Sequence, residues 1–124
     1  MFEPYLEQAI RFLAPLGQPC GIEGEVIMPE TVARLSSDYD LRVVFLVRSS
    51  ATSANISDSR GPNPWLERAT PDLASSVTAE VLSWSRHLQL ACRRLSIRCF
   101  DVGGDFEHTI EEAADALMAD ARPA

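Results

Sequence analysis

The run Leu41–Val47 (LRVVFLV) constrains the fold more than any other stretch of this chain. It is rich in β-branched residues and almost uninterrupted, which predicts a strand covered on both faces, as in a parallel sheet between layers of helices. A second short run of this kind, Ile97–Val102, follows a long helical pattern. Because a strand, a helix and a strand in succession form a right-handed parallel crossover, we predict an α/β fold.

A third strand is predicted earlier in the chain. Cys20–Met28 is a short apolar run broken by two glycines and two glutamates, and we interpret it as a strand that leads into a tight loop. The fold class is therefore α/β, with a short parallel sheet of about three strands and flanking helices. At 124 residues, the chain 1–124 is expected to form a single domain.

Three shorter helices are predicted from spacing and end signals. Apolar residues recur with helical spacing in Glu3–Ala14, and Pro29 opens a helix that reaches about Leu35. Thr109 and Glu112 match a capping box, in which a hydroxyl and a carboxylate three residues apart satisfy the first backbone amides. We therefore place the start of the last helix at Thr109.

The longest helix begins at Thr70-Pro71-Asp72 and runs to about Leu95. Thr70 supplies a capping hydroxyl, Pro71 fits the first helical position, and Asp72 complements the positive end of the helix dipole. Before this helix, residues 49–64 are rich in Ser, Asn, Gly and Pro. Such a long irregular segment in a small domain is typically functional or disordered, and we interpret about 49–69 as a lid-like loop.

Charge and cysteine content exclude several classes of function. The net charge of −7 and the isoelectric point near 4.7 argue against nucleic acid and anionic membranes as main partners. The sequence has neither a signal-peptide pattern nor a stretch long enough to span a bilayer, so we expect a cytoplasmic protein. The three cysteines have no close pair, which favours buried free thiols over disulfides or zinc ligands.

Four segments, in order, resemble those of phosphate-loop kinases for nucleotides and small molecules, the adenylate-kinase-like group. Gly21–Pro29 is similar to their third-strand segment, Arg42–Val47 to their fourth strand, and Arg98–Gly103 to their fifth strand. The polar loop that carries Arg60 and Arg68 is similar to their mobile lid. The resemblance covers nearly the whole chain but corresponds to about two-thirds of such a domain. The glycine-rich phosphate loop is missing, and the 124 residues contain no lysine.

The resemblance implies roles for two glutamates at the end of the predicted third strand. Glu23 would be catalytic, either holding Mg²⁺ or taking a proton from a substrate hydroxyl, and Glu25 would be a second binding candidate. Carboxylates at the carboxyl end of a parallel strand lie where ligands bind in open α/β sheets. The alternative is that both are solvated loop residues or cap the helix after Pro29.

The resemblance also implies that arginines bind the phosphates of ATP. Arg60 would be a catalytic lid residue, with Arg68 and Arg48 as further binding candidates, because a guanidinium matches phosphate oxygens in pairs. Asp101 and Gly103 end the last strand, where the backbone of related kinases packs against a purine and glycine allows close approach. The alternatives are solvated arginines and a glycine that only makes the turn.

The missing first strand leaves three alternatives for the sheet. The strands at Ile22–Ile27 and Leu41–Val47 pair directly, a second copy forms a homodimer, or an N-terminal segment outside this chain completes the sheet. We predict a truncated or degenerate kinase-like protein whose parent activity is phosphoryl transfer from a nucleoside triphosphate to a small molecule. The chain alone would be inactive, because the main phosphate cradle is absent. The rival hypothesis is a non-catalytic acidic α/β module that binds proteins and needs no cofactor.

Overall fold

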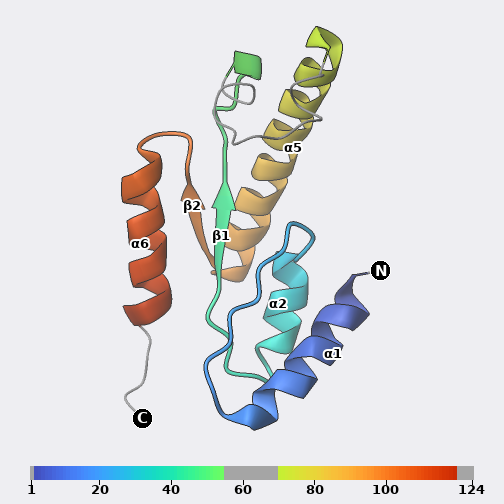
Figure 1. Ribbon diagram of the computed structural model, residues 1–124, viewed down its shortest axis with the longest axis vertical. Coiled ribbons are helices and arrows are strands. Elements are labelled where there is room, and N and C mark those ends of the chain that lie inside the picture. Colours follow the sequence, from blue (N-terminus) through green and yellow to red (C-terminus); the bar gives the residue numbers. More distant parts are fainter. Residues whose placement is uncertain (1, 55–69, 120–124) are drawn as a thin grey trace.

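The computed structural model describes residues 2–54 and 70–119. Figure 1 shows a small sheet with α6 on the side of β2 and α5 on the other side, with α2 beside the carboxyl-terminal part of α5 and α1 beside α2. This arrangement of helices around a parallel sheet confirms the predicted α/β class. The elements in chain order are α1 (Glu3–Leu13), a 3-10 turn (Ala14–Leu16), α2 (Pro29–Leu35), β1 (Val44–Val47), α5 (Pro71–Leu95), β2 (Arg98–Asp101) and α6 (Phe106–Ala119).

The sheet in the described residues consists of β1 and β2, which pair in parallel. Val44 lies opposite Arg98 and Val47 lies opposite Asp101, and α5 connects the two strands. The ladder extends one residue further, since the Val102 amide donates to the Val47 carbonyl at 2.8 Å. The predicted crossover is therefore confirmed, and both carboxyl ends of the strands meet at one edge of the sheet.

The predicted strand at Cys20–Met28 is wrong. This segment contains no strand, makes a turn at Glu25–Val26 and is exposed as far as Val26. Its two glycines raise the backbone entropy cost of an extended conformation. Its two glutamates are charged and add no apolar side chain that a strand could bury against a helix. Ile22–Ile27 therefore does not pair with β1, and the described residues form a sheet of two strands instead of about three.

Two hydrophobic clusters hold the elements together. The larger one joins the sheet to α5 and α2, and the smaller one joins α1 to α2. Ile27 packs against both clusters, so its apolar side chain anchors the segment before α2 in place of strand pairing. The buried members of the larger cluster are Val32, Phe45, Val47, Leu88 and Cys92, and those of the smaller one are Leu6, Ile10 and Leu35.

Helix α5 begins and ends where the sequence predicts. The Thr70 hydroxyl accepts a hydrogen bond from the Leu73 amide at 3.3 Å, and Pro71 occupies the first helical position. Ser96, in the left-handed conformation with φ 56°, ends the helix and lets the chain turn directly into β2. The buried residues of α5 all lie in its carboxyl-terminal half: Ser85, Leu88, Ala91 and Cys92.

The predicted capping box at Thr109 is wrong, because α6 already begins at Phe106. The Asp105 carboxylate accepts a hydrogen bond from the His108 amide at 3.1 Å and so takes the capping role. Glu112 instead lies 3.6 Å from the His108 ring, one turn along the helix. The turn after β2 is therefore short, and the amino terminus of α6 lies close to the carboxyl edge of the sheet.

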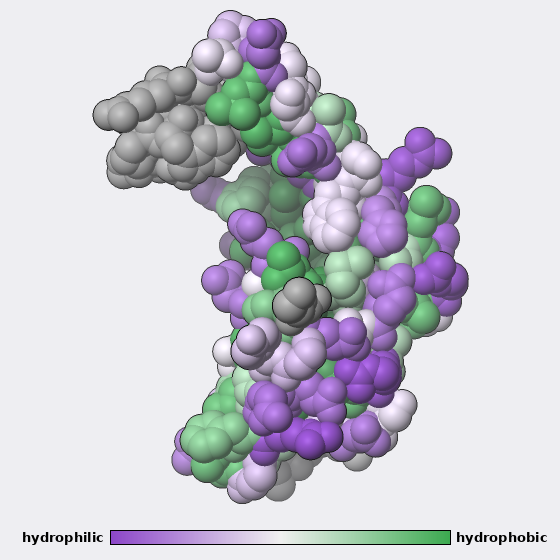
Figure 2. Space-filling model, turned by 90° about the vertical axis from the view of Figure 1, so that its right-hand side faces the viewer, coloured by the Kyte–Doolittle hydropathy of each residue, from purple (hydrophilic) through white to green (hydrophobic). Residues whose placement is uncertain are grey.

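Ion pairs join the helices on the exposed side. Arg34 of α2 contacts Glu3 of α1 at 2.8 Å and Glu7 at 3.3 Å, and Arg94 of α5 contacts Glu30 of α2 at 2.6 Å. Figure 2 views the side on which α1, α2 and α5 lie, and hydrophilic residues cover much of its lower half. Exposed pairs of this kind each stabilise a fold by less than about 1 kcal/mol, so the apolar clusters are the main contribution to packing.

Candidate functional site at the carboxyl edge of the sheet

The carboxyl edge of the β1–β2 sheet brings together polar residues from two distant parts of the chain. Arg48, Ser49 and Ser50 follow β1, whereas Asp101 ends β2 and Gly103 lies in the turn to α6. In open α/β sheets, ligands bind outside the carboxyl ends of the strands. Three of the predicted binding residues, Arg48, Asp101 and Gly103, therefore lie together at the edge where such a fold places its ligand.

The Asp101 carboxylate is the centre of this group. One of its oxygens accepts hydrogen bonds from the Gly103 amide at 3.0 Å and from the Ser49 amide at 3.3 Å. The other oxygen accepts a hydrogen bond from the Ser49 hydroxyl. The carboxylate thus ties the segment after β1 to the turn after β2. Hydrogen bonds to an ionised acceptor are among the stronger ones in proteins.

These contacts keep Asp101 ionised. Partial burial of the carboxylate acts to raise its pKa, but the hydrogen bonds from Ser49 and Gly103 and the positive charge of Arg48 outweigh this effect. The net result is a pKa below the usual value for aspartate. Asp101 therefore carries a negative charge beside the positive charge of Arg48 at neutral pH.

Arg48 is positioned through its backbone by the long helix. Its amide donates to the hydroxyl of Ser85 at 3.0 Å, and Ser85 is a buried residue of α5. This bond satisfies the amide of the residue that directly follows β1. Ser85 and Ser49 were not identified from the sequence. Serines are common in loops and on helices, and only the position of Ser49 directly after a predicted strand could have suggested a role.

The two glycines of the turn have different surroundings. A Cβ atom on Gly103 would lie 2.5 Å from the Ser50 hydroxyl and 3.1 Å from the Asp101 carboxylate, so a larger residue there would have to displace both side chains. A Cβ on Gly104 would meet nothing within 4 Å. The close approach at Gly103 is thus explained by packing within the fold, and Gly104 is the glycine that faces open space.

Glu23 and Glu25 are not drawn into this group. Both are exposed in the segment before α2, and neither has a hydrogen-bond or ion-pair partner among the described residues. The neighbouring Gly24 lies close to Ile27 and to Phe2, at the start of α1. The glutamates therefore follow no strand, which removes the structural reason for assigning them to a strand end.

The glutamate expected to hold magnesium, Glu23, is exposed in the segment before α2. Mg²⁺ requires octahedral oxygen coordination, usually with one or two carboxylates. Within residues 2–54 and 70–119, no group of three or more histidine, cysteine or acidic side chains could hold a metal ion. The predicted lid arginines, Arg60 and Arg68, lie outside the described residues, as does most of the lid-like loop.

Comparison with known proteins gave no relative. No protein-family model matches the chain, and neither the curated proteins nor the solved structures contain a match. In the part of the chain that the structure describes, no helix is long and apolar enough to cross a membrane.

Proposed function

We propose that this chain is a kinase-like α/β protein that binds a nucleotide at the carboxyl edge of its sheet and does not transfer phosphate by itself. The observation that carries the proposal is the cross-strand hydrogen bonding of Asp101 to Ser49 at the end of two parallel strands joined by a helix. This is the edge at which the fold class binds nucleotides.

The residues at this edge suit different parts of a nucleotide. The positive charge of Arg48 suits a phosphate group, because a guanidinium presents paired donors to phosphate oxygens. Gly104 leaves open space in which a flat ring could approach the backbone. The Asp101 carboxylate already accepts three hydrogen bonds, and two oxygens have about four acceptor positions, so one hydroxyl or amino donor could still be accepted.

Phosphoryl transfer by this chain alone is not expected. Catalysis in phosphate-loop enzymes depends on donors that surround the transferred phosphoryl group, including a lysine and a bound Mg²⁺. The 124 residues contain no lysine. The proposal is therefore binding without turnover, and ATP is the probe.

Nuclear magnetic resonance of the ¹⁵N-labelled chain during titration with ATP tests this proposal. We expect shifts of the Ser49, Gly103 and Gly104 amides, no release of inorganic phosphate, and weaker binding in Gly104→Val. Gly21→Val is the matched control, because a Cβ on Gly21 also meets nothing within 4 Å but lies far along the chain from the edge. Unchanged spectra at millimolar ATP would contradict the proposal, as would equal effects of the two variants.

A second candidate function, protein binding without a ligand, is favoured by the apolar side chains on the surface. Leu46 of β1 is 46% exposed although it lies in a strand of the sheet, and Trp84 of α5 is 44% exposed. Light scattering over a range of concentrations tests this candidate. A mass that rises from one copy to two would support a homodimer, whereas a constant single-copy mass would exclude self-association as the role of these side chains.

A further inference from the structure

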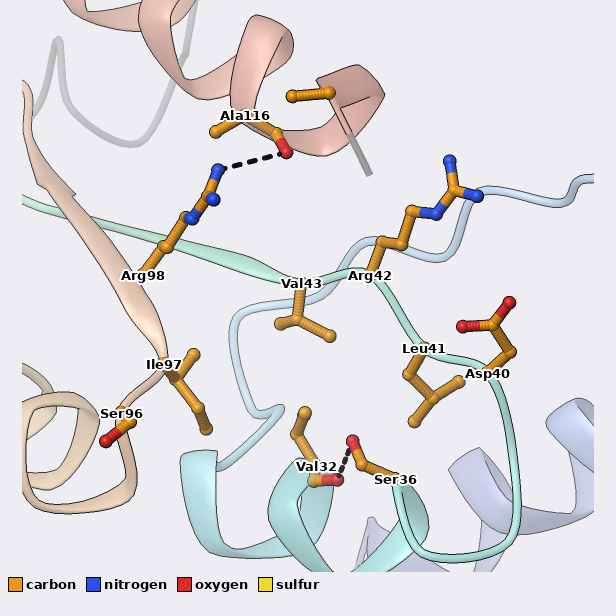
Figure 3. Close-up of a pocket in the computed structure, with 11 residues that line it drawn as sticks. Val32, Ser36, Asp40, Leu41, Arg42, Val43, Ser96, Ile97, Arg98 and Ala116 are labelled. Carbon is orange, nitrogen blue, oxygen red and sulfur yellow. Dashed lines mark hydrogen bonds between the residues drawn. The ribbon is translucent and has the colours of Figure 1, made fainter. Parts of the chain in front are cut away.

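An open cavity of about 580 Å³ lies at the amino edge of the sheet (Figure 3). Four segments form it: the end of α2, the extended segment before β1, the start of β2 and the last turn of α6. The side chains of Arg42 and Arg98 point apart in this cavity, and Arg98 donates to the Ala116 carbonyl at 3.3 Å. The two guanidinium groups therefore do not share a ligand. A second, smaller hollow lies beside α1.

Helix α1 carries two adjacent apolar stripes, of which one is buried. Leu6 and Ile10 are buried in the smaller cluster with Leu35 of α2. Tyr5 and Phe12 lie two turns apart on the neighbouring stripe and are 72% and 74% exposed. Phe12 has the highest exposed fraction of the large apolar side chains that the structure describes. Exposed apolar surface of this kind, concentrated on one helix, marks an interaction site.

The hollow beside α1 is large enough for an aromatic ring. It has a volume of about 300 Å³ and lies between the start of α1 and the segment that leads into α2. An apolar cavity of about 150 Å³ is already sufficient to bind benzene. The apolar part of its lining consists of Phe2, Leu6, Val26, Ile27 and Met28. The same surface thus presents an exposed ring and a hollow that fits a ring.

These two features meet when two copies of α1 pair in antiparallel orientation. The amino end of one helix then lies beside the carboxyl end of the other. Phe12 of one copy can reach the hollow at the start of α1 in its partner, and the two-fold symmetry makes the same contact a second time. Ala9 lies between Tyr5 and Phe12 in the sequence, and its small side chain lets the two helices approach closely at the symmetry axis.

The exposed aromatic area is sufficient for a reversible dimer. Because Tyr5 and Phe12 are about three-quarters exposed, covering them in both copies would remove roughly 450–750 Å² of apolar surface from water. A specific interface buries about 1,200–2,000 Å² in total, of which a little more than half is apolar. The four aromatic side chains therefore supply most of the apolar area that a small specific interface needs.

The charges beside this surface permit a second copy to approach. Glu7 pairs with Arg11 at 2.9 Å, and Glu3 pairs with Arg34 of α2 at 2.8 Å, so the ionised groups of α1 and this arginine cancel. The chain as a whole has a net charge of −7, which makes two copies repel each other at long range. The surface around α1 is therefore one at which two copies can meet without added repulsion.

We propose that two copies of this chain associate through α1, in an antiparallel pair in which Phe12 of each copy fills the hollow beside α1 of the other. This surface is distinct from the side chains Leu46 and Trp84, and its pairing does not depend on nucleotide binding at the carboxyl edge. The limited area makes the dimer reversible. Added salt should strengthen it, because salt screens the repulsion between two acidic chains.

Sedimentation equilibrium of the whole chain, from micromolar to millimolar concentration, tests the proposal. We expect the mass to rise from one copy to two, and Phe12→Ser should raise the dimer Kd at least about tenfold. Trp84→Ser is the matched control, because it replaces an exposed aromatic side chain of α5 and should leave the Kd unchanged. In a mixture of isotope-labelled and unlabelled chains, nuclear magnetic resonance should show the Phe12 ring of one copy in contact with Leu6 and Val26 of the other.

The other outcomes would overturn the proposal. A single-copy mass over the whole range would exclude a second copy and leave α1 to a partner of another kind. Equal weakening by Phe12→Ser and Trp84→Ser would show unspecific association, and contacts between copies that omit Phe12 would place the interface elsewhere. Phe12→Ser should keep the folded spectrum, since the side chain is exposed. If it did not, Val26→Ser, at a 53% exposed position in the lining of the hollow, replaces it and should raise the Kd several-fold.

Discussion

The carboxylate of Asp101, at the end of β2, accepts hydrogen bonds from both the amide and the hydroxyl of Ser49, which lies 52 positions earlier in the chain. This contact joins the two strand ends at the edge where the nucleotide is proposed to bind. Because the Gly103 amide also donates to Asp101, one side chain fixes the geometry of both connecting segments.

The charge of Asp101 should make stability depend on pH. Its pKa is lower in the folded chain than in the unfolded chain, where aspartate titrates near about 3.9. The stabilisation is therefore fully present above about pH 5 and is lost as the pH falls through the unfolded value toward the lower folded one. Urea unfolding of the wild type and Asp101→Asn between pH 3 and pH 7 should show a difference that is largest at pH 7.

Asp115→Asn is the matched control for this series. Asp115 is exposed on α6 and has no hydrogen-bond partner among the described residues, so its replacement should change stability by less than about 0.5 kcal/mol at neutral pH. If Asp101→Asn were as stable as this control at pH 7, the hydrogen bonds to Ser49 would contribute nothing to the folded state.

Replacing each of the two neighbouring glycines by alanine should destabilise the fold at Gly103 and have almost no effect at Gly104. Gly103→Ala places a methyl group 2.5 Å from the exposed Ser50 hydroxyl, which must rotate away, and 3.1 Å from the Asp101 carboxylate, which must shift against its hydrogen bonds. The substitution should cost about 0.5–1.5 kcal/mol of unfolding free energy. Gly104→Ala meets nothing within 4 Å and should stay within about 0.5 kcal/mol of the wild type. Thermal unfolding of both variants measures the difference, and similar melting temperatures would contradict the packing at Gly103.

The three thiols should differ strongly in reactivity. Cys20 is exposed, whereas Cys92 is fully buried and Cys99 is partly buried. Burial raises the pKa of Cys92 to about 12, with a further contribution from Cys99, and burial also raises the pKa of Cys99. Since the thiolate is the reactive form, a disulfide reagent at pH 8 should modify Cys20 rapidly and the other two only after unfolding.

The control for this experiment is Cys20→Ala. It should abolish the fast reaction and leave two thiols that appear only in denaturant. Two fast thiols in the native wild type would show that the packing between α5 and β2, which covers Cys92 and Cys99, opens readily.

The long-range part of the site was predictable from the sequence only through the strand pattern. The apolar run before Arg48 and the run that ends at Asp101 identified two parallel strands, and this placed their carboxyl ends at one edge. The failure at Cys20–Met28 has a physical reason: two glycines and two glutamates within a short apolar run weaken its preference for an extended strand. Ile27 finds its burial between two clusters instead.

Local patterns also failed where two signals competed. Thr109 and Glu112 match a capping box, but Asp105 precedes them and caps the helix one turn earlier. The cavity lined by Arg42 and Arg98 could not be predicted. Four separate segments of the chain form it, and local sequence patterns do not indicate which distant segments lie together in the fold.

The length of α5 has a consequence for how the protein moves. The helix has 25 residues, about 37 Å at 1.5 Å per residue, whereas each strand of the sheet has four residues. Its first half therefore projects past the sheet (Figure 1), and its buried residues begin only at Ser85. Amide hydrogens in the first turns should exchange with solvent far faster than those around Cys92, so that one continuous helix contains a labile end and a protected end.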